Sequence, residues 1–364
     1  MVPYLIIYFS ISIASLYNVF IKRYNFTLFL ILILIIGVFS GSRITSLGGY
    51  DTDVYSKVFS EVPSNFSDAL TADSFYLLSM EKGYIIINWL AKGLGLNFNQ
   101  FLLSLGIISA IGLYSVFKKY SQYYFVVLLI FLAKGYLYYF FTAQRQVLAM
   151  ILCWYSIHFL LNKKLWIFVL CIIIAIQFHT SSIVFFIAYF CSRYRLNNKW
   201  AVIIVTISLI VGLSKIGLLV GQSFSAYLPG EQISEKVNNY IENSEAGVNI
   251  LNFLELVPFF LILIYWRKSI EEKFPNFDFF FNIFLVYLCL TFAFYNFQFI
   301  ARLKGYFVIG YILMISSFFY IGSNKVKFGI LLIVIFYCLA VFVRELLVFD
   351  DGEGYLPYQS FLFE

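Results

Sequence analysis

Charged residues are scarce in this sequence: Asp, Glu, Lys and Arg make up 12% of its 364 residues, while hydrophobic residues make up 62%. A water-soluble domain keeps about a quarter of its residues charged. This chain has too few polar groups to cover a water-exposed surface, and apolar runs of about twenty residues recur along it. The alternating ten-residue segments of a membrane barrel are not seen. We therefore expect an all-α polytopic membrane protein.

Histidine and cysteine are also rare, with two His and five Cys. All five Cys lie in apolar runs and show neither zinc-site spacing nor a disulfide framework. The sequence contains no HExxH motif and no Cys/His cluster, and we expect neither a metal nor another cofactor. The net charge of +6 comes from short basic loops, so it does not indicate nucleic-acid binding.

The short loops rich in Lys and Arg define a topology, because such loops stay in the cytoplasm. If the N-terminus lies outside, every basic loop falls inside when the chain crosses the membrane about twelve times. The expected spans are residues 3–20, 26–42, 98–117, 123–141, 146–161, 165–178, 180–192, 200–220, 250–266, 278–299, 303–321 and 328–347.

Two conditions must hold for this topology. Residues 83–96 are too short to cross and are interrupted by Gly93 and Gly95, so they must form a re-entrant or interfacial segment. Residues 165–192 must form two short helices that turn at His179 rather than one span. If either condition fails, the orientation of the segments between them is reversed.

Acidic residues gather on the outer side of this topology. Of the 19 Asp and Glu residues, Glu271, Glu272 and Asp278 alone fall inside. The positive-inside rule does not require this, because acids contribute little to it. We therefore expect the outer face to carry the working surface. A single membrane domain, residues 1–364, would present three long outer segments: 43–83 with short helices, 221–249, and the C-terminal tail 348–364.

The stretch GSRITSLGGYDTDVY, residues 41–55, places charge and flexibility directly after an apolar run. Arg43 ends the second expected span. Asp51 and Tyr55 are four residues apart and share a face if this segment is helical, whereas Asp53 points elsewhere. Asp51 is either a functional carboxylate or the N-cap of that helix, with Thr52 assisting.

Four more ionisable residues lie near membrane depth, where such groups are expensive and usually functional. Glu81 is either a solvated interfacial residue beside Lys82 or part of a site. Arg145 lies between two apolar segments and either snorkels to the headgroups or faces the interior. His179 lies at the expected helix break, as a hydrogen-bonded interior residue or a site residue. Arg302 lies between two later spans on the outer side.

These residues share a chemistry. Arginine binds two oxygens of a phosphate at once and stays charged, so two arginines at the outer interface suit a lipid-linked pyrophosphate. A histidine or carboxylate can accept the proton of an attacking hydroxyl near neutral pH. Asp51-Thr52-Asp53 is formally a DxD motif, but no such pair lies on the cytoplasmic side, where nucleotide sugars would bind.

The ordered set GYDTDVY, EKGYIIIN, QRQVLAMIL, FHTSSIVFF and ARLKGYF resembles the motifs of the EpsG-type, Wzy-like family of bacterial polysaccharide polymerases. The resemblance covers about residues 40–310 and a Pro-Tyr pair in the tail, Pro357-Tyr358. The first motif matches only approximately, because Tyr50 separates its glycine from Asp51. The matching residues of the later motifs are Glu81, Gly83, Tyr84, Arg145, Gln146, Ala149, His179, Ser181, Arg302 and Tyr306.

The resemblance implies an enzyme of the bacterial inner membrane with a GT-C-like helical bundle, acting without a metal at a site that faces the periplasm. Its substrate would be an oligosaccharide carried on undecaprenyl pyrophosphate, polymerised into O-antigen, capsule or exopolysaccharide. Membrane lipid, a flippase and a chain-length regulator would be its partners. We expect catalytic roles for His179, Glu81 and Asp51, pyrophosphate contacts from Arg145, Arg302 and Arg43, and further substrate contacts from Asp53, Tyr55, Tyr84, Gln146 and Tyr306.

Two alternatives stay open. A GT-C-type transferase that uses a polyprenyl-phosphate sugar predicts a metal-dependent acidic loop at Asp51 and Asp53. A flippase for the same lipid-linked glycan predicts cationic residues along an inner cavity, together with internal repeats. The charges of this sequence gather at one face, which favours chemistry over transport.

Overall fold

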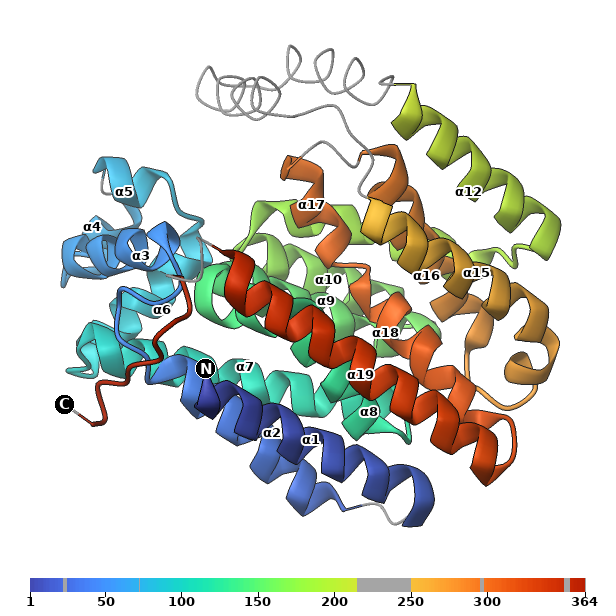
Figure 1. Ribbon diagram of the computed structural model, residues 1–364. Helices are drawn as coiled ribbons and strands as arrows, with labels where there is room; N and C mark the ends of the chain where they lie inside the picture. The colour runs from blue at the N-terminus through green and yellow to red at the C-terminus, as the bar shows by residue number, and fades with distance from the viewer. Residues whose placement is uncertain (22–24, 72, 215–249, 295–297, 350–353, 364) are drawn as a thin grey trace. The chain divides into compact units, whose positions relative to one another are not determined.

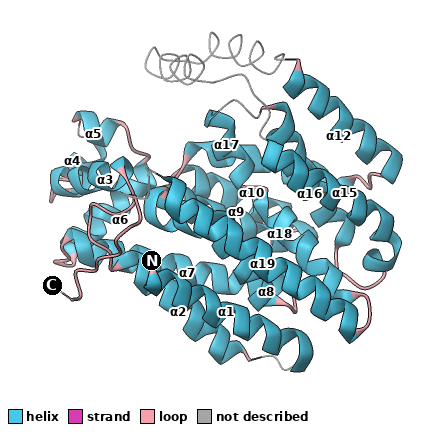
Figure 2. Cartoon of the chain, in the orientation of Figure 1, coloured by secondary structure: helices cyan, strands magenta, loops and turns pink. Residues whose placement is uncertain are grey.

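The structure is a computed structural model that describes residues 1–21, 25–71, 73–214, 250–294, 298–349 and 354–363 (Figure 1). The described residues form helices and loops without any strand, as Figure 2 shows. The chain divides into two compact units: Met1–Ile183 with Gly322–Glu364, and Val184–Ile321. The expected outer segment 221–249 lies outside the described residues. The expectation of a single membrane domain stays a prediction.

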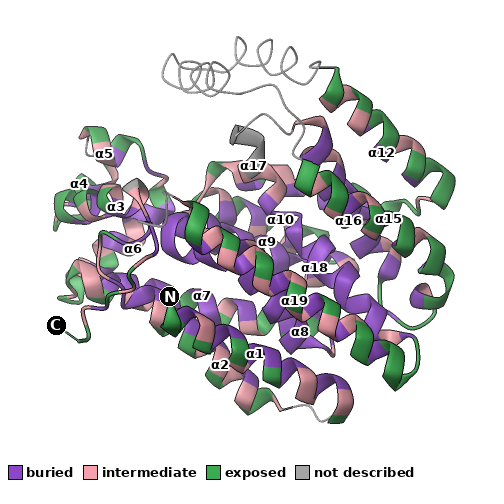
Figure 3. Ribbon diagram, viewed as in Figure 1, coloured by how far each residue is buried: buried purple, intermediate pink, exposed green. Residues whose placement is uncertain are grey.

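Among the described residues, four helices are long and apolar enough to cross a membrane: α1 (Val2–Ile21), α7 (Phe98–Tyr120), α15 (Ile250–Glu271) and α19 (Asn324–Val348). Exposed apolar side chains run along α1 and α19, the arrangement expected of lipid-facing helices (Figure 3). The protein is therefore membrane-embedded. The shorter apolar helices are α2 (Phe26–Gly41), α8 (Tyr124–Phe131), α10 (Leu165–Ile176), α11 (Ile187–Arg193), α12 (Asn198–Leu213), α16 (Phe277–Ala293) and α18 (Val308–Ser317).

The helix bounds agree with both conditions of the expected topology, while the topology itself stays a prediction. Within residues 83–96 the helix α6 (Lys82–Gly93) ends at Gly93, and its 12 residues span about 18 Å, less than the roughly 30 Å of a bilayer core. Helix α10 ends at Ile176, and a 3₁₀ helix, η3 (Thr180–Phe186), follows. The break at His179 is thus confirmed.

In two places the structure divides an expected span into shorter helical segments. Residues 123–141 form α8 followed by two π-helical stretches, η1 (Leu132–Tyr136) and η2 (Tyr138–Thr142), before α9 (Gln144–Leu161) begins. Between α16 and α18 lies a separate helix, α17 (Gln298–Gly305). The 3₁₀ helix η4 (Phe318–Tyr320) closes α18. π-Helical turns are rare and occur frequently at functional sites.

In the second unit, the phenylalanine-rich helix α16 packs against α11, α12, α15, α17 and α18. Its buried Asn282 supplies polar contacts in this apolar setting: Nδ2 donates to the carbonyl oxygens of Cys191 at 3.0 Å and Tyr194 at 2.6 Å. These carbonyls lie at the C-terminal end of α11, where helix carbonyls lack intrahelical partners. One side chain therefore fixes the end of α11 against α16.

Helices α2 and α7 of the first unit approach each other through glycines. The sequence GVFSG places Gly37 and Gly41 four residues apart on one face of α2, and Gly106 faces them from α7. A Cβ atom on Gly37 would lie 2.6 Å from the carbonyl oxygen of Gly106 and 2.7 Å from the Cβ of Ala110. The two backbones can be this close because no side chain separates them.

This contact predicts that Gly37→Ala destabilises the protein by about 1–3 kcal/mol, because the added methyl group overpacks a backbone contact. Gly329→Ala is the matched control, since a Cβ at Gly329 in α19 meets nothing within 4 Å. The midpoint of thermal unfolding of the purified protein measures both. Equal midpoints for the two variants would contradict a close α2–α7 contact.

Candidate functional site

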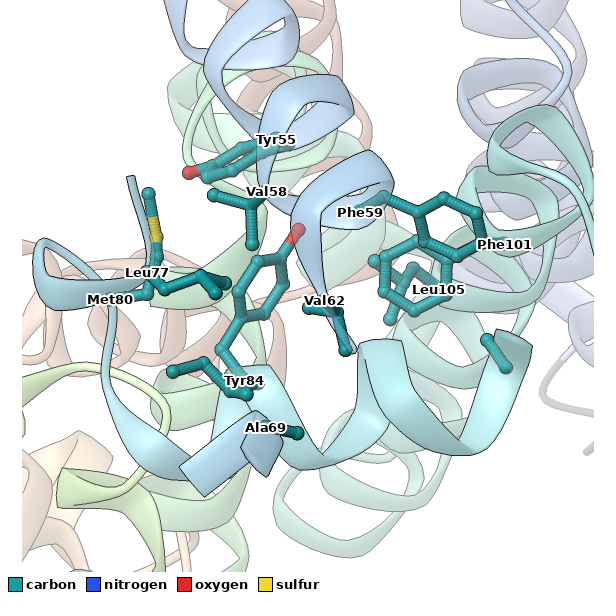
Figure 4. Close-up of a cluster of buried hydrophobic side chains, with 12 residues drawn as sticks. Tyr55, Val58, Phe59, Val62, Ala69, Leu77, Met80, Tyr84, Phe101 and Leu105 are labelled. Atoms are coloured by element: carbon teal, nitrogen blue, oxygen red, sulfur yellow. The ribbon is translucent and has the colours of Figure 1, made fainter. Parts of the chain in front are cut away.

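Four short helices pack together between α2 and α7 in the chain: α3 (Tyr50–Glu61), α4 (Phe66–Thr71), α5 (Phe75–Leu78) and α6. The apolar residues of α3 recur at helical spacing and lie on one buried face. Figure 4 shows this cluster, in which α3 contacts α6 and the start of α7. Its members include Tyr55, Val58, Phe59, Val62, Ala69, Leu77, Met80, Tyr84, Phe101 and Leu105.

Polar side chains of α6 complete the same packing. Lys92 Nζ donates to the carbonyl oxygens of Ser60 at 2.9 Å and Val62 at 2.7 Å, at the C-terminal end of α3. Trp89 Nε1 donates to the Ser64 carbonyl at 2.8 Å. A cation at a helix C-terminus is favourable because the last carbonyls lack partners and carry partial negative charge. The loop after α3 is therefore held to α6.

Arg43 follows α2 and is fully buried. Its Nη1 donates to the Ser40 carbonyl at 2.6 Å, its Nε to the Leu47 carbonyl at 2.9 Å, and its Nη2 to the Phe141 carbonyl at 2.5 Å. Burial lowers the pKa of Arg43 to about 10, so the guanidinium is still charged at neutral pH. Its donors serve protein oxygens, which favours an organising role over the expected pyrophosphate contact.

Thr52, in the first turn of α3, completes this contact. Its Oγ1 donates to the Phe141 carbonyl at 3.2 Å and lies 3.3 Å from Arg43 Nη2. Phe141 lies near the end of η2, where a carbonyl has no helical partner further along the chain. The end of η2, the start of α3 and the loop after α2 are thus joined at a single oxygen.

The C-terminal tail lies against the same loop. The Gly354 carbonyl accepts from Gly48 N at 2.8 Å, Ser360 Oγ donates to the Ser42 carbonyl at 2.8 Å, and Tyr358 Oη donates to the Phe39 carbonyl at 2.8 Å. The rings of Tyr358 and Phe39 stack with centroids 3.9 Å apart. The expected tail therefore positions the segment that leads into α3.

Glu81 joins three segments that are far apart in the sequence. Its carboxylate forms an ion pair with Arg145 Nη1, and its Oε1 accepts from the backbone N–H of Thr180 at 2.9 Å. The side chains of Glu81 and Arg145 are 17% and 18% exposed, so the pair is largely removed from water. This contact brings the segments EKGY, QRQ and FHTS together, and Glu81 is not simply a solvated interfacial residue.

Gly83 allows this approach. A Cβ atom at this position would lie 2.6 Å from the carbonyl oxygen of Gln177 and 2.8 Å from its Cβ. The first turn of α6 therefore packs directly on the backbone that follows α10. A larger residue would push Glu81 away from Thr180.

Two buried tyrosines lie beside Arg145. Its guanidinium carbon is 5.6 Å from the ring centroid of Tyr55 and 5.9 Å from that of Tyr84, within the range of a cation–π contact. Burial raises the pKa of the Tyr55 phenol, and the Arg145 charge opposes part of that rise, so the phenol is a neutral donor. The Tyr84 hydroxyl and Arg145 Nε have no hydrogen-bond partner among the described residues.

Arg145 also lies where a cation is unfavourable. It is the second residue of α9, next to the positive end of the helix dipole, and Ala143 at the N-cap offers no side-chain acceptor. A positive first turn is suited to an anion, because backbone N–H groups and the guanidinium can bind the same oxygens. The geometry is compatible with a phosphate and with contact to Glu81 on another edge of the guanidinium.

His179 precedes Thr180, the residue held by Glu81. Its Nδ1 lies 2.6 Å from Ser181 Oγ. In the tautomer in which Nδ1 carries the proton, Nδ1 donates a hydrogen bond to Ser181 Oγ, and the basic lone pair is on Nε2. His158 lies in a different place, in the last turn of α9, where its Nδ1 is 3.0 Å from Asn162 Nδ2.

Asp51 does not cap α3, and that alternative was wrong. The helix begins two residues earlier than a cap at Asp51 would require, with Gly49 at the N-cap and no side-chain capping bond. Asp51 is half-buried on the side of Tyr55, whereas Asp53 is exposed. Residues two apart on a helix point about 200° apart, so the two carboxylates do not converge as a DxD pair would require. No group of three His, Cys, Asp or Glu able to hold a metal is found in the described part of the chain.

The remaining expected residues lie in two places. Gln146 is buried in the first turn of α9, beside Arg145. Arg302 is half-buried in α17, and Tyr306, just after that helix, is fully buried. Both belong to the second unit, so the convergence of Arg302 with Arg145 stays a prediction.

Comparison with known proteins gives one result. The EpsG family model matches residues 26–360, nearly the whole chain. No curated protein and no solved structure matches the chain. The matched range contains all the segments that meet at Glu81.

The contact between Glu81 and Arg145 predicts strong coupling in a double-mutant cycle. Glu81→Ala or Arg145→Ala alone leaves a mostly buried charge without its partner, whereas the double variant removes both charges. We expect a coupling energy of about 0.5–3 kcal/mol in the free energy of unfolding. Glu61, an exposed acid whose Oε2 accepts from Ser74, is the matched control in a cycle with Arg145. Additive effects for Glu81 and Arg145 would show that the pair is not formed.

Proposed function

Because the chain belongs to the EpsG family, a family of membrane proteins of polysaccharide biosynthesis, we propose that it polymerises lipid-linked oligosaccharide repeat units. The units are carried on undecaprenyl pyrophosphate in the bacterial inner membrane, and the site faces the periplasm. The product is O-antigen, capsule or exopolysaccharide. In this proposal the chain crosses the membrane about twelve times with a GT-C-like arrangement of helices. Its partners are a flippase and a chain-length regulator.

The observation that carries this proposal is the meeting of three polar segments at Glu81. Arg145 and Thr180 lie 64 and 99 residues from Glu81 in the sequence, yet both contact its carboxylate. The contact places a cation suited to phosphate and the segment containing His179 at the same carboxylate. A protein that only needed to span lipid would gain nothing from keeping these charges at the edge of the bilayer.

The proposed reaction uses this arrangement directly. A hydroxyl of the incoming repeat unit attacks the anomeric carbon of the growing chain, and the bond from that carbon to the pyrophosphate oxygen breaks. The bonding electrons leave with the pyrophosphate, whose added negative charge Arg145 stabilises without reorganising. The proton of the hydroxyl passes to Nε2 of His179. Glu81 orients Arg145 and Thr180, and Tyr55, Tyr84, Gln146 and Asp51 supply donors and acceptors for sugar.

The residues favour this reaction over both alternatives. The divergent Asp51 and Asp53 do not form the acidic pair that a metal-dependent transferase would need. A flippase requires cationic residues along a passage between the two membrane faces. Arg145, Glu81 and His179 instead gather where α6, α9 and the break after α10 meet.

We expect His179→Ala to leave mostly single-repeat glycan, because a sugar hydroxyl is a poor nucleophile without a base. General-base catalysis is worth about 10² to 10⁴ in rate. The gene is deleted, the variant is supplied in trans, and the glycan is separated on a gel. His158→Ala is the matched control and should retain long chains. Within the described residues, the His158 side chain forms a hydrogen bond with Asn162 at the end of its own helix.

Long chains at the wild-type level in His179→Ala, with normal protein in the membrane, would reject His179 as the base. Loss of all glycan on deletion of the gene, rather than accumulation of single repeats, would indicate a flippase and reject the proposed function.

We expect Arg145→Lys and Arg302→Lys each to impair polymerisation severely. Lysine keeps the charge but loses the planar, two-pronged contact with pyrophosphate. Removing one preorganised donor from a developing anion costs about 10² to 10³ in rate. The same gel measures chain length, and polymerisation in inverted or permeabilised membranes is measured with EDTA, which we expect to leave the wild type active.

Arg193→Lys is the control for the substitution itself, because Arg193 is exposed at the end of α11 and lies over Tyr189. Normal long chains in both the Arg145→Lys and Arg302→Lys variants would mean that these side chains only extend to lipid headgroups. Inhibition by EDTA that added Mg²⁺ reverses would favour the metal-dependent transferase.

A further inference from the structure

A second polar site is formed by residues of the second unit, none of which has a part in the proposed reaction. It is a cavity of about 660 Å³ between the segment that begins α12 and the C-terminal half of α15. This volume falls within the range of small-molecule pockets, about 300–1,000 Å³. Its lining is mostly polar and basic and consists of Arg195, Asn197, Asn198, Lys199, Ile264, Tyr265, Arg267, Lys268 and Glu271.

One cation of this cavity is fixed by the protein. The Arg267 side chain is 7% exposed, its Nη1 donates to Asn198 Oδ1 at 2.9 Å, and its Nη2 donates to Asp278 Oδ1 at 2.7 Å. Its guanidinium carbon lies 4.4 Å from the centroid of the Phe281 ring. Arg195 completes the network through Asp278, at 3.1 Å, and through Glu271. A preorganised guanidinium loses little entropy when a ligand binds.

Two further cations of the cavity are not used by the protein. Lys199 and Lys268 lie on its lining, and no described carboxylate is within 4 Å of either ammonium group. The four cations exceed the two carboxylates, Glu271 and Asp278, by two charges. The first turn of α12, a helix of 16 residues, adds its partial positive charge. The cavity is therefore suited to a ligand that carries negative charge.

Exposed aromatic side chains occur on the cavity lining, at Tyr265, and on residues next to the lining in the sequence. Tyr194, Trp200, Tyr265 and Trp266 are all exposed on the surface of this unit. Tyrosine and tryptophan concentrate at the level of lipid headgroups, where one end of the ring is in apolar surroundings and the other is wet. We therefore expect the cavity to open at the level of the lipid headgroups.

We infer that this cavity binds the phosphate headgroup of an anionic glycerophospholipid of the cytoplasmic leaflet. Lys199 and Lys268 contact the phosphate, the fixed Arg267 lines the site, and the exposed aromatic rings lie at the level of the headgroup. The positive-inside rule explains why basic residues occur near the start of α12 and the end of α15. It does not require a cavity, or a buried Arg267 that donates two hydrogen bonds. The inference does not depend on the polymerase reaction, whose proposed residues lie elsewhere in the sequence.

Lipid titration of the purified full-length protein tests the inference. The protein is delipidated in detergent, phosphatidylglycerol or phosphatidylcholine with the same acyl chains is added, and bound lipid is counted by native mass spectrometry. We expect preferential binding of phosphatidylglycerol. The double variant Lys199→Gln/Lys268→Gln should raise the apparent Kd for this lipid about fivefold per lysine, roughly 25-fold in all.

The double variant Lys164→Gln/Lys325→Gln is the matched control. It removes the same charge from two exposed lysines on the expected inner side, one before α10 and one in the first turn of α19, and it should leave the apparent Kd unchanged. Equal binding of the two lipids, or an equal loss in both double variants, would overturn the site. Competition by free glycerol 3-phosphate as effective as that by phosphatidylglycerol would show a soluble-phosphate site, and the lipid assignment would then be wrong.

Discussion

The burial of the Arg43 guanidinium constrains everything around the candidate site. Transferring an ion from water into a protein costs several kcal/mol after relaxation, and no described carboxylate lies within ion-pair distance of Arg43. Its charge is offset instead by carbonyl oxygens of Ser40, Leu47 and Phe141, and by the Phe141 ring 5.0 Å away. Each oxygen comes from a segment that the side chain must hold in place. The position of α3, and with it Tyr55, follows from this arrangement.

Glu81 is the anionic counterpart of Arg43 in the same unit, because it also holds several segments together. Arg43 uses one cation to gather neutral oxygens, whereas Glu81 uses one carboxylate to gather donors from α9 and from the break after α10. The close packing of Gly83 on Gln177 makes the second contact geometrically possible. The break at His179 is therefore stabilised from outside its own helices, because Glu81 accepts a hydrogen bond from the backbone N–H of Thr180.

Much of this could be predicted from sequence, for a physical reason. Long apolar runs indicate which segments contact lipid, and basic loops indicate which segments contact water. The described apolar helices therefore fall close to the expected spans. The break at His179 could be predicted because a polar run interrupts an apolar one there. The π-helical turns could not be predicted, because they depend on packing rather than composition. Neither could the role of Arg43, since a basic residue at the end of a span looks the same whether it faces a ligand or a carbonyl.

Arg43 and Arg145 show why sequence pattern alone does not separate a structural arginine from a functional one. Both lie beside the end of an apolar helix and near Tyr and Phe rings. The donors of Arg43 end on protein oxygens, and its burial is complete. Arg145 keeps a buried Nε without a described partner and lies at the positive end of α9, where its own charge is unfavourable. An anion bound there would satisfy the Nε and the helix end together, which is why Arg145 suits a phosphate and Arg43 does not.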